Sequence, residues 1–233
     1  MIKKTDRIWE LDFLRGVAIF VMVFVHMGFD SDMYLYTNFQ PIITVLSHFA
    51  FIFIALAGMG CVFSHNNIKR FGVLTLLSAG ISITSYIWSN DDFIFFGILH
   101  MLALSTLLYS LIFRHLNNYI IGILAIVSLC VGFFMNLDID NMFTMILGIS
   151  PIYIETLDFF PVFPWIGAFL VGIILARRVY KERNSRLSKP KPKWINGIIS
   201  FFEFLGRHTL LIYIIHQPIL LVVFWFIIGM PMA

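Results

Sequence analysis

The chain has 233 residues, of which 60% are hydrophobic and only 12% are charged, and its mean hydropathy is +0.90. Soluble globular domains carry about 25% charged residues. The composition therefore excludes that class and predicts an all-α, polytopic transmembrane helix bundle. The formal net charge of +3 does not indicate nucleic-acid binding, because the basic residues lie in short loops between apolar segments. We expect a single transmembrane domain over residues 1–233.

Seven apolar segments are long enough to cross a bilayer, which takes about 17–25 helical residues. They run from Ile8 to Phe29, Ile42 to Ser64, Ile68 to Trp88, Phe93 to Phe113, Tyr119 to Met135, Phe160 to Val179 and Phe204 to Gly229. Between the fifth and sixth segments, the stretch from Asn136 to Asp158 has an apolar part, Met142 to Ile149, that is too short to span. We expect that part to be re-entrant or interfacial.

The charges of the loops predict an orientation. Lysine and arginine cluster at the N-terminus and around the loops after the second, fourth and sixth segments, whereas the other loops contain neither and carry only acidic charges. Short basic loops face the cytoplasm. Seven spans with this asymmetry place the N-terminus in the cytoplasm and the C-terminus outside. The K-P-K-P-K stretch that begins at Lys189 is typical of a cytosolic linker.

The first segment carries charged and polar residues where lipid would be expected. Asp12, Arg15, His26 and Asp30 fall on one narrow stripe, because at about 100° per residue they lie within about 60° of one another. A charge in hydrocarbon costs roughly 2.5–3.5 kcal/mol on insertion scales. The stripe must therefore face protein, water or a ligand. It extends roughly 16 Å along the axis from Arg15 to His26.

The predicted orientation sorts the polar residues into two layers. Three histidines from three helices share the outer half of the membrane: His26, His48 and His100. A second group lies at the inner ends of the first and last segments: Asp12, Arg15, Arg207 and His208. This arrangement suits an anionic ligand on the cytoplasmic side and proton chemistry nearer the outside.

Each of these residues also has a purely structural interpretation. Asp12 and Arg15 could simply pair at i, i+3, or Arg15 could extend to the interface. His26 could be a hydrogen-bonded packing residue, although Asp30 is one turn away and could fix its tautomer. His216, before Gln217 and Pro218, could satisfy a backbone carbonyl freed at a proline kink.

Four segments carry a resemblance to a known family. They are R-I-W-E-L-D-F-L-R-G-V-A-I-F-V-M-V-F-V-H from Arg7 to His26, F-G-I-L-H from Phe96 to His100, F-P-W-I-G-A-F-L-V-G from Phe163 to Gly172, and L-G-R-H-T-L-L-I-Y-I-I-H-Q-P from Leu205 to Pro218. The chain resembles the catalytic-domain family of heparan-alpha-glucosaminide N-acetyltransferase, which has many bacterial members. The resemblance implies a transmembrane acyltransferase that takes acetyl-CoA from the cytosol and modifies an amine or hydroxyl at the far side.

The carry-over of site residues from the family is partial. The family's eukaryotic enzyme has an active-site asparagine at the position of His26, and its catalytic histidine lies in the following loop. The loop here, from Ser31 to Pro41, contains no histidine. Either His26 takes that role or His48 supplies it. The chain is also shorter than the longer members, so a heparan-type acceptor is not implied. A sugar or lipid-linked acceptor of a bacterial envelope, and a bacterial cytoplasmic membrane, fit better.

Acyl transfer from a thioester needs a base or a nucleophile, and a histidine can serve as either. We assign the catalytic role to a set drawn from the outer layer: His26, Asp30, His48 and His100. The phosphates of acetyl-CoA need cations, and we assign the inner layer of Asp12, Arg15, Arg207 and His208 to that cofactor. The expected partners are acyl-CoA, the acceptor and the bilayer, and the chain could also form a homodimer.

Two other classes compete with this interpretation. Aspartate, arginine and histidine inside the membrane also mark proton-coupled transporters of small molecules. A zinc site built from the three outer histidines and Asp30 has suitable ligand types. No close spacing of histidines supports a metal, so we predict none.

Overall fold

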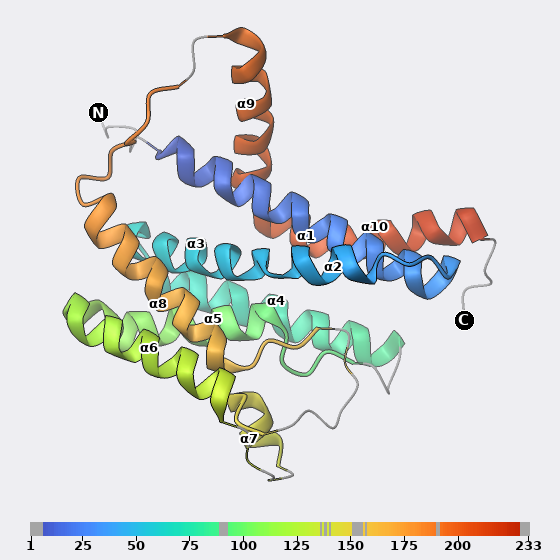
Figure 1. Ribbon diagram of the computed structural model, residues 1–233, viewed down its shortest axis with the longest axis horizontal. Coiled ribbons are helices and arrows are strands. Elements are labelled where there is room, and N and C mark those ends of the chain that lie inside the picture. Colours follow the sequence, from blue (N-terminus) through green and yellow to red (C-terminus); the bar gives the residue numbers. More distant parts are fainter. Residues whose placement is uncertain are drawn as a thin grey trace. The chain divides into compact units, whose positions relative to one another are not determined.

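The computed structural model describes residues 7–88, 93–135, 137, 139, 141–150, 156, 158–189 and 192–228. In this part of the chain the structure is helical and contains no strand (Figure 1). The helices are α1 (Trp9–Leu35), α2 (Gln40–Ser47), α3 (Phe49–Phe63), α4 (Asn67–Trp88), α5 (Ile98–Leu111), the 3-10 helix η1 (Phe113–His115), α6 (Asn118–Phe134), α7 (Met142–Leu147), α8 (Val162–Val179), α9 (Lys193–Arg207) and α10 (Thr209–Ile228). The all-helical prediction is confirmed.

Five stretches of helix are long and apolar enough to cross a membrane. They are Trp9–Leu35, Gln40–Phe63, Asn67–Trp88, Val162–Val179 and Thr209–Ile227. The helices Ile98–Leu111 and Asn118–Phe134 are apolar but shorter. Each of these seven stretches overlaps one of the seven predicted segments. The short apolar part after the fifth segment contains α7, which begins at an Asn141 cap and ends before Gly148.

The structure differs from the predicted segments at two helix breaks. The second segment is interrupted at His48, which separates α2 from α3. The last segment was predicted to begin at Phe204, but Phe204 to Arg207 form the end of α9, and α10 begins at Thr209. The linker prediction is also too long at its end, because Lys193 already starts α9, while 190–191 lie outside the described residues.

The chain divides into two compact units, residues 1–53 with 182–233 and residues 54–181. In the first unit α1 packs against α9, α10 and α2 (Figure 1). The helices α1 and α10 run in the same direction, since successive contacts rise together along both. His26 meets His216 at 4.9 Å between ring centroids, and Tyr34 meets Phe224 at 5.9 Å.

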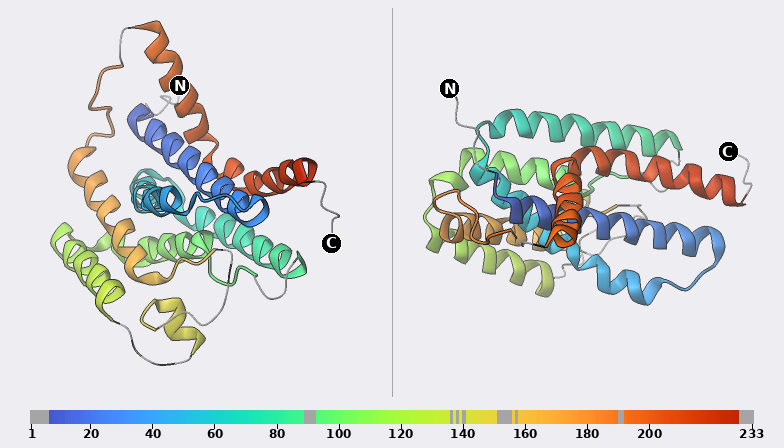
Figure 2. Two further views of the ribbon diagram at one scale, coloured as in Figure 1. Left: turned by 45° about the vertical axis from the view of Figure 1, so that its right-hand side comes forward. Right: turned by 90° about the horizontal axis from the view of Figure 1, so that it is seen from above.

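The second unit contains two close helix pairs, α4 with α5 and α6 with α8 (Figure 2). Small residues bring its helices together, as is usual between membrane helices. A methyl group at Gly58 would clash with the backbone of Phe169, and one at Gly172 would clash with the backbone of Ala55. Arg177 ties the turn after α5 to α8 through the carbonyls of Leu116 (2.6 Å) and Phe113 (2.9 Å).

Candidate functional site

The site in the first unit begins where α1 crosses α9. Two glycines allow the backbones to meet there: Gly16 lies against the backbone of Phe202, and Gly206 lies against the backbone of Asp12. A side chain at either glycine would keep the helices apart. Gly16 follows Arg15 in the L-R-G sequence, and Gly206 precedes Arg207 in L-G-R. The crossing therefore places the two arginines beside one another.

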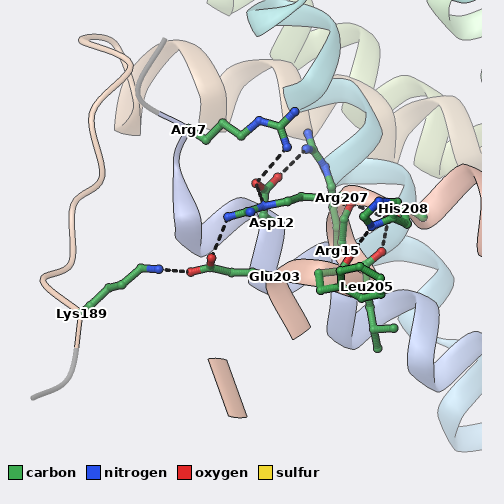
Figure 3. A network of polar contacts seen from close by, with 11 residues as sticks. Arg7, Asp12, Arg15, Lys189, Glu203, Leu205, Arg207 and His208 are labelled. Atoms are coloured by element: carbon green, nitrogen blue, oxygen red, sulfur yellow. Dashed lines mark hydrogen bonds and ion pairs between the residues drawn. The ribbon is translucent and has the colours of Figure 1, made fainter. Parts of the chain in front are cut away.

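Asp12 is the centre of an ion-pair network at this crossing (Figure 3). Its side chain is only 8% exposed and lies 3.4 Å from Arg15 Nη1, 3.5 Å from Arg207 Nε and 3.9 Å from Arg7 Nη1. The i, i+3 pairing of Asp12 and Arg15 is confirmed. One buried carboxylate thus orients three arginines.

A second buried carboxylate, Glu203, extends the network along α9. It accepts a hydrogen bond from Arg207 Nη2 at 2.8 Å and forms an ion pair with Lys189 from the linker (Figure 3). Glu203 and Lys189 were not among the predicted site residues. The sequence E-F-L-G-R places Glu203 and Arg207 at i and i+4, and this spacing could have predicted their ion pair. The whole network holds four cationic groups and two carboxylates, and therefore carries an excess of positive charge.

His208 lies next to this network without belonging to its ion pairs. Its ring is exposed, with Nδ1 2.8 Å from the carbonyl oxygen of Phe204. It stacks on Phe204 at 4.4 Å between ring centroids. Of the four residues predicted to hold the cofactor, the structure therefore joins Asp12, Arg15 and Arg207 in one network, whereas His208 ends α9.

The linker before α9 is fastened to the start of α1. Glu10 is buried, and its Oε1 accepts hydrogen bonds from the backbone N–H groups of Arg186 (2.6 Å) and Leu187 (2.7 Å). The indole of Trp9 donates to the carbonyl of Leu187 at 3.0 Å. Lys189 lies over the Trp9 ring at 5.7 Å from its centroid. These contacts hold the linker against the cationic network.

A second polar cluster lies further along α1, where it meets α10. The rings of His26 and His216 are neighbours, and Gln217 Nε2 donates to both carboxylate oxygens of Asp30 at 3.1 and 3.2 Å. The predicted stripe of α1 is thus matched by partners on α9 and α10. The hydrogen bond that the structure shows at Asp30 comes from Gln217 rather than from His26. His216 Nδ1 lies 2.6 Å from the carbonyl oxygen of Tyr213, which agrees with the structural interpretation of this residue.

The structure does not bring His48 to His26. His48 is exposed at the break between α2 and α3, and its Nδ1 lies 2.8 Å from the carbonyl oxygen of Thr44 in its own helix. His100 belongs to the second unit, where Nε2 lies 3.2 Å from Ser82 Oγ and Nδ1 accepts from the N–H of Gly97. Within the described residues no group of three or more histidine, cysteine or acidic side chains could hold a metal.

An apolar cavity of about 230 Å³ lies in the first unit between α1, α2 and α10. Gly28 and Ser31 of α1, Ile43 of α2 and Phe224 of α10 contribute to its wall. Since no ionisable side chain lines it, this cavity cannot supply acid–base chemistry.

A comparison with known protein families identifies the family of the chain. The family model described as heparan-alpha-glucosaminide N-acetyltransferase, catalytic, matches residues 7–218. The chain belongs to this family. No curated protein and no solved structure matches it significantly.

Membership in the heparan-alpha-glucosaminide N-acetyltransferase catalytic family confirms the resemblance seen in the sequence. With its apolar helices, the chain is an integral membrane protein of the acyltransferase type. The matched range contains both the cationic network at Arg15 and Arg207 and the polar cluster at His26 and His216. The first and the last of the four segments that carry the resemblance supply Arg15, His26, Arg207 and His216 to these clusters.

Proposed function

We propose that this protein transfers an acetyl group from cytosolic acetyl-CoA to an amine or hydroxyl of a sugar or lipid-linked acceptor at the outer side of the membrane. The observation that carries the proposal is the arrangement of the first unit. Helix α1 shares a cationic network with α9 near its start and a histidine cluster with α10 further along.

The cationic network is suited to the phosphates of CoA. Guanidinium groups bind phosphate through paired, charge-assisted hydrogen bonds. Arg7, Lys189 and Arg207 are between 43% and 67% exposed at their side chains, while their carboxylate partners are buried. The buried carboxylates orient the cations, and the positive excess remains for an anionic ligand. We assign Asp12 a positioning role rather than direct contact with phosphate.

The acyl group would be transferred at the histidine cluster. Arg15 and His26 are eleven residues apart on one helix, a rise of roughly 16 Å, which is comparable to an extended pantetheine arm. A donor anchored at the network could therefore present its thioester near His26 and Asp30. His48 and His100 are not needed in this proposal.

The direction of transfer rests on the loop charges. The basic loops place the network on the cytoplasmic side, and we propose seven spans in a bacterial cytoplasmic membrane. Parallel α1 and α10 agree with an odd number of spans. In a background without Cys61 and Cys130, a cysteine at Ser185 should react with an impermeant maleimide only after the inner face is exposed, and one at Thr37 should react from outside. The reverse pattern would contradict the proposed direction.

Binding of acetyl-CoA to protein in nanodiscs tests the nucleotide site. Arg15→Ala should weaken binding about 10-fold or more, because a hydrogen bond to a charged group contributes about 1.5–3 kcal/mol. Arg178→Ala is the matched control, since Arg178 is an exposed arginine in the last turn of α8. Equal affinities for the two variants would count against a phosphate role for Arg15.

A proton-coupled transporter is the alternative function, because the buried Asp30 and His216 beside His26 are also typical of proton relays. The two are separated by the fate of acetyl-CoA in proteoliposomes. An acyltransferase releases free CoA thiol in the presence of an acceptor such as glucosamine or glucose. A carrier moves a solute across the membrane and leaves the thioester intact.

A further inference from the structure

His216 is held in one tautomer by its own helix. Its Nδ1 lies 2.6 Å from the carbonyl oxygen of Tyr213. A carbonyl can only accept a hydrogen bond, so Nδ1 must carry the proton. In the neutral ring the lone pair then lies on Nε2. The backbone of α10 therefore fixes which nitrogen of His216 is basic.

The basic nitrogen is buried without a partner. His216 is 8% exposed, and Nε2 has no hydrogen-bond partner among the residues that the structure describes. Buried polar atoms are almost always paired, because an unpaired one loses the hydrogen bond that it made to water. Oε1 of the neighbouring Gln217 is likewise buried and unpaired within the described chain. Two adjacent residues thus each retain an acceptor for a ligand that donates hydrogen bonds.

His26, the residue indicated by the sequence, differs from His216 in this respect. It lies beside His216, with ring centroids 4.9 Å apart, but no hydrogen bond in the described structure selects one of its tautomers. A general base works best when a third group orients it. In the pair of histidines, His216 has that support from Tyr213.

We propose that His216 is a catalytic residue of the acyl transfer, with Nε2 accepting the proton of the acceptor's hydroxyl or amine. The inference rests on the proposed function. As the acceptor heteroatom attacks the thioester carbonyl, its bond to the acyl carbon forms and its proton moves to Nε2. The carbon–sulfur bond then breaks, and the proton passes to the departing thiolate. The products are the acylated acceptor and free CoA thiol, and no other reactant is required.

The variant His216→Asn separates the two roles of the ring. The asparagine amide can still donate to the Tyr213 carbonyl from near the position of Nδ1, but it offers no base at the position of Nε2. In nanodiscs, transfer from acetyl-CoA to glucosamine or glucose should fall by about 10²–10⁴-fold, the range for loss of a general base. Acetyl-CoA affinity should remain within about 3-fold of wild type. Transfer within 3-fold of wild type would overturn the proposal.

A measurement on the unmutated protein keeps the proposal testable if this variant fails to fold. Nitrogen chemical shifts of ¹⁵N-histidine, assigned by the loss of a signal in His216→Gln, report which ring nitrogen is protonated. We expect His216 to be protonated at Nδ1, and a ring protonated only at Nε2 would overturn the proposal. If wild-type protein transfers acetyl to neither probe, the proposed function fails, whereas the tautomer measurement still decides whether His216 presents a basic Nε2.

Discussion

At the crossing of α1 and α9, we expect even the substitution of a glycine by alanine to destabilise the protein. A methyl group at Gly16 would lie 3.0 Å from the Cα of Phe202 and closer still to its carbonyl group. Carbon atoms in good contact are about 3.5–4.0 Å apart, so the helices must separate by at least about 0.5–1 Å. The ion pair between Arg207 and Asp12 is 3.5 Å long and lies next to this point. The same separation would therefore weaken the cationic network.

The free-energy change has two opposing parts. Overpacking costs about 1–3 kcal/mol, whereas alanine is favoured over glycine inside a helix by about 0.8–1.0 kcal/mol. Gly197→Ala on α9 is the matched control, because a methyl group there meets nothing within 4 Å. Gly197→Ala should therefore show only the stabilisation that alanine gives to a helix. The difference between Gly16→Ala and Gly197→Ala thus isolates the crossing, at about 1–3 kcal/mol.

Thermal unfolding in detergent, followed by tryptophan fluorescence, measures this difference. For a chain of this size about 1–3 kcal/mol corresponds to roughly 2–12 °C in the midpoint. Gly16→Ala should melt below Gly197→Ala by that interval and should also bind acetyl-CoA more weakly. Combining Gly16→Ala with Gly206→Ala should cost less than the sum, because the first methyl group already separates the helices. Equal midpoints for Gly16→Ala and Gly197→Ala would refute the close crossing.

Two other contacts give predictions with controls in the same chain. Glu10→Gln weakens the hydrogen bonds that hold the linker, so trypsin should cleave after Arg186 roughly 10-fold faster. The control Glu182→Gln changes an exposed residue and should leave the cleavage rate unchanged. Equal cleavage rates for the two variants would contradict the role of Glu10 in holding the linker. Arg177→Ala leaves carbonyls after α5 without their donor and should cost about 1.5–3 kcal/mol in thermal unfolding. Arg178→Ala removes an exposed arginine and should leave the unfolding midpoint unchanged. Equal unfolding midpoints for the two variants would contradict the role of Arg177.

The polar stripe of α1 could be predicted because helical periodicity alone determines which residues share a face. The structure places Asp12 against α9 and Asp30 against α10, on the stripe that the spacing indicated. Burial of these groups also followed from the cost of charge in hydrocarbon. Periodicity does not predict which residues of other helices pair with the stripe. His26 and His216 are far apart in sequence, and only the packing of α1 on α10 brings their rings together.

The break before the last span could not be predicted from hydropathy, because the apolar run continues through it. Phe204 and Leu205 are as apolar as the residues of α10, so an averaged window joins them. The structure instead assigns them to α9, whose Trp194, Ile198 and Phe201 are exposed. An amphipathic helix with exposed apolar residues after a basic linker is typical of the membrane interface. Glu203 was missed for the same reason, since it lies within that apolar run.

The buried charges of the first unit are costly to its stability. An ion pair with a buried carboxylate, such as that of Asp12 with Arg207, often contributes no more to stability than well-packed apolar residues would, because desolvation offsets its attraction. Further along α1, His216 of α10 keeps an acceptor that has no partner among the described residues, which adds a further cost. Both costs agree with our proposal that the first unit binds a ligand with phosphates near Asp12 and a hydrogen-bond donor near His216.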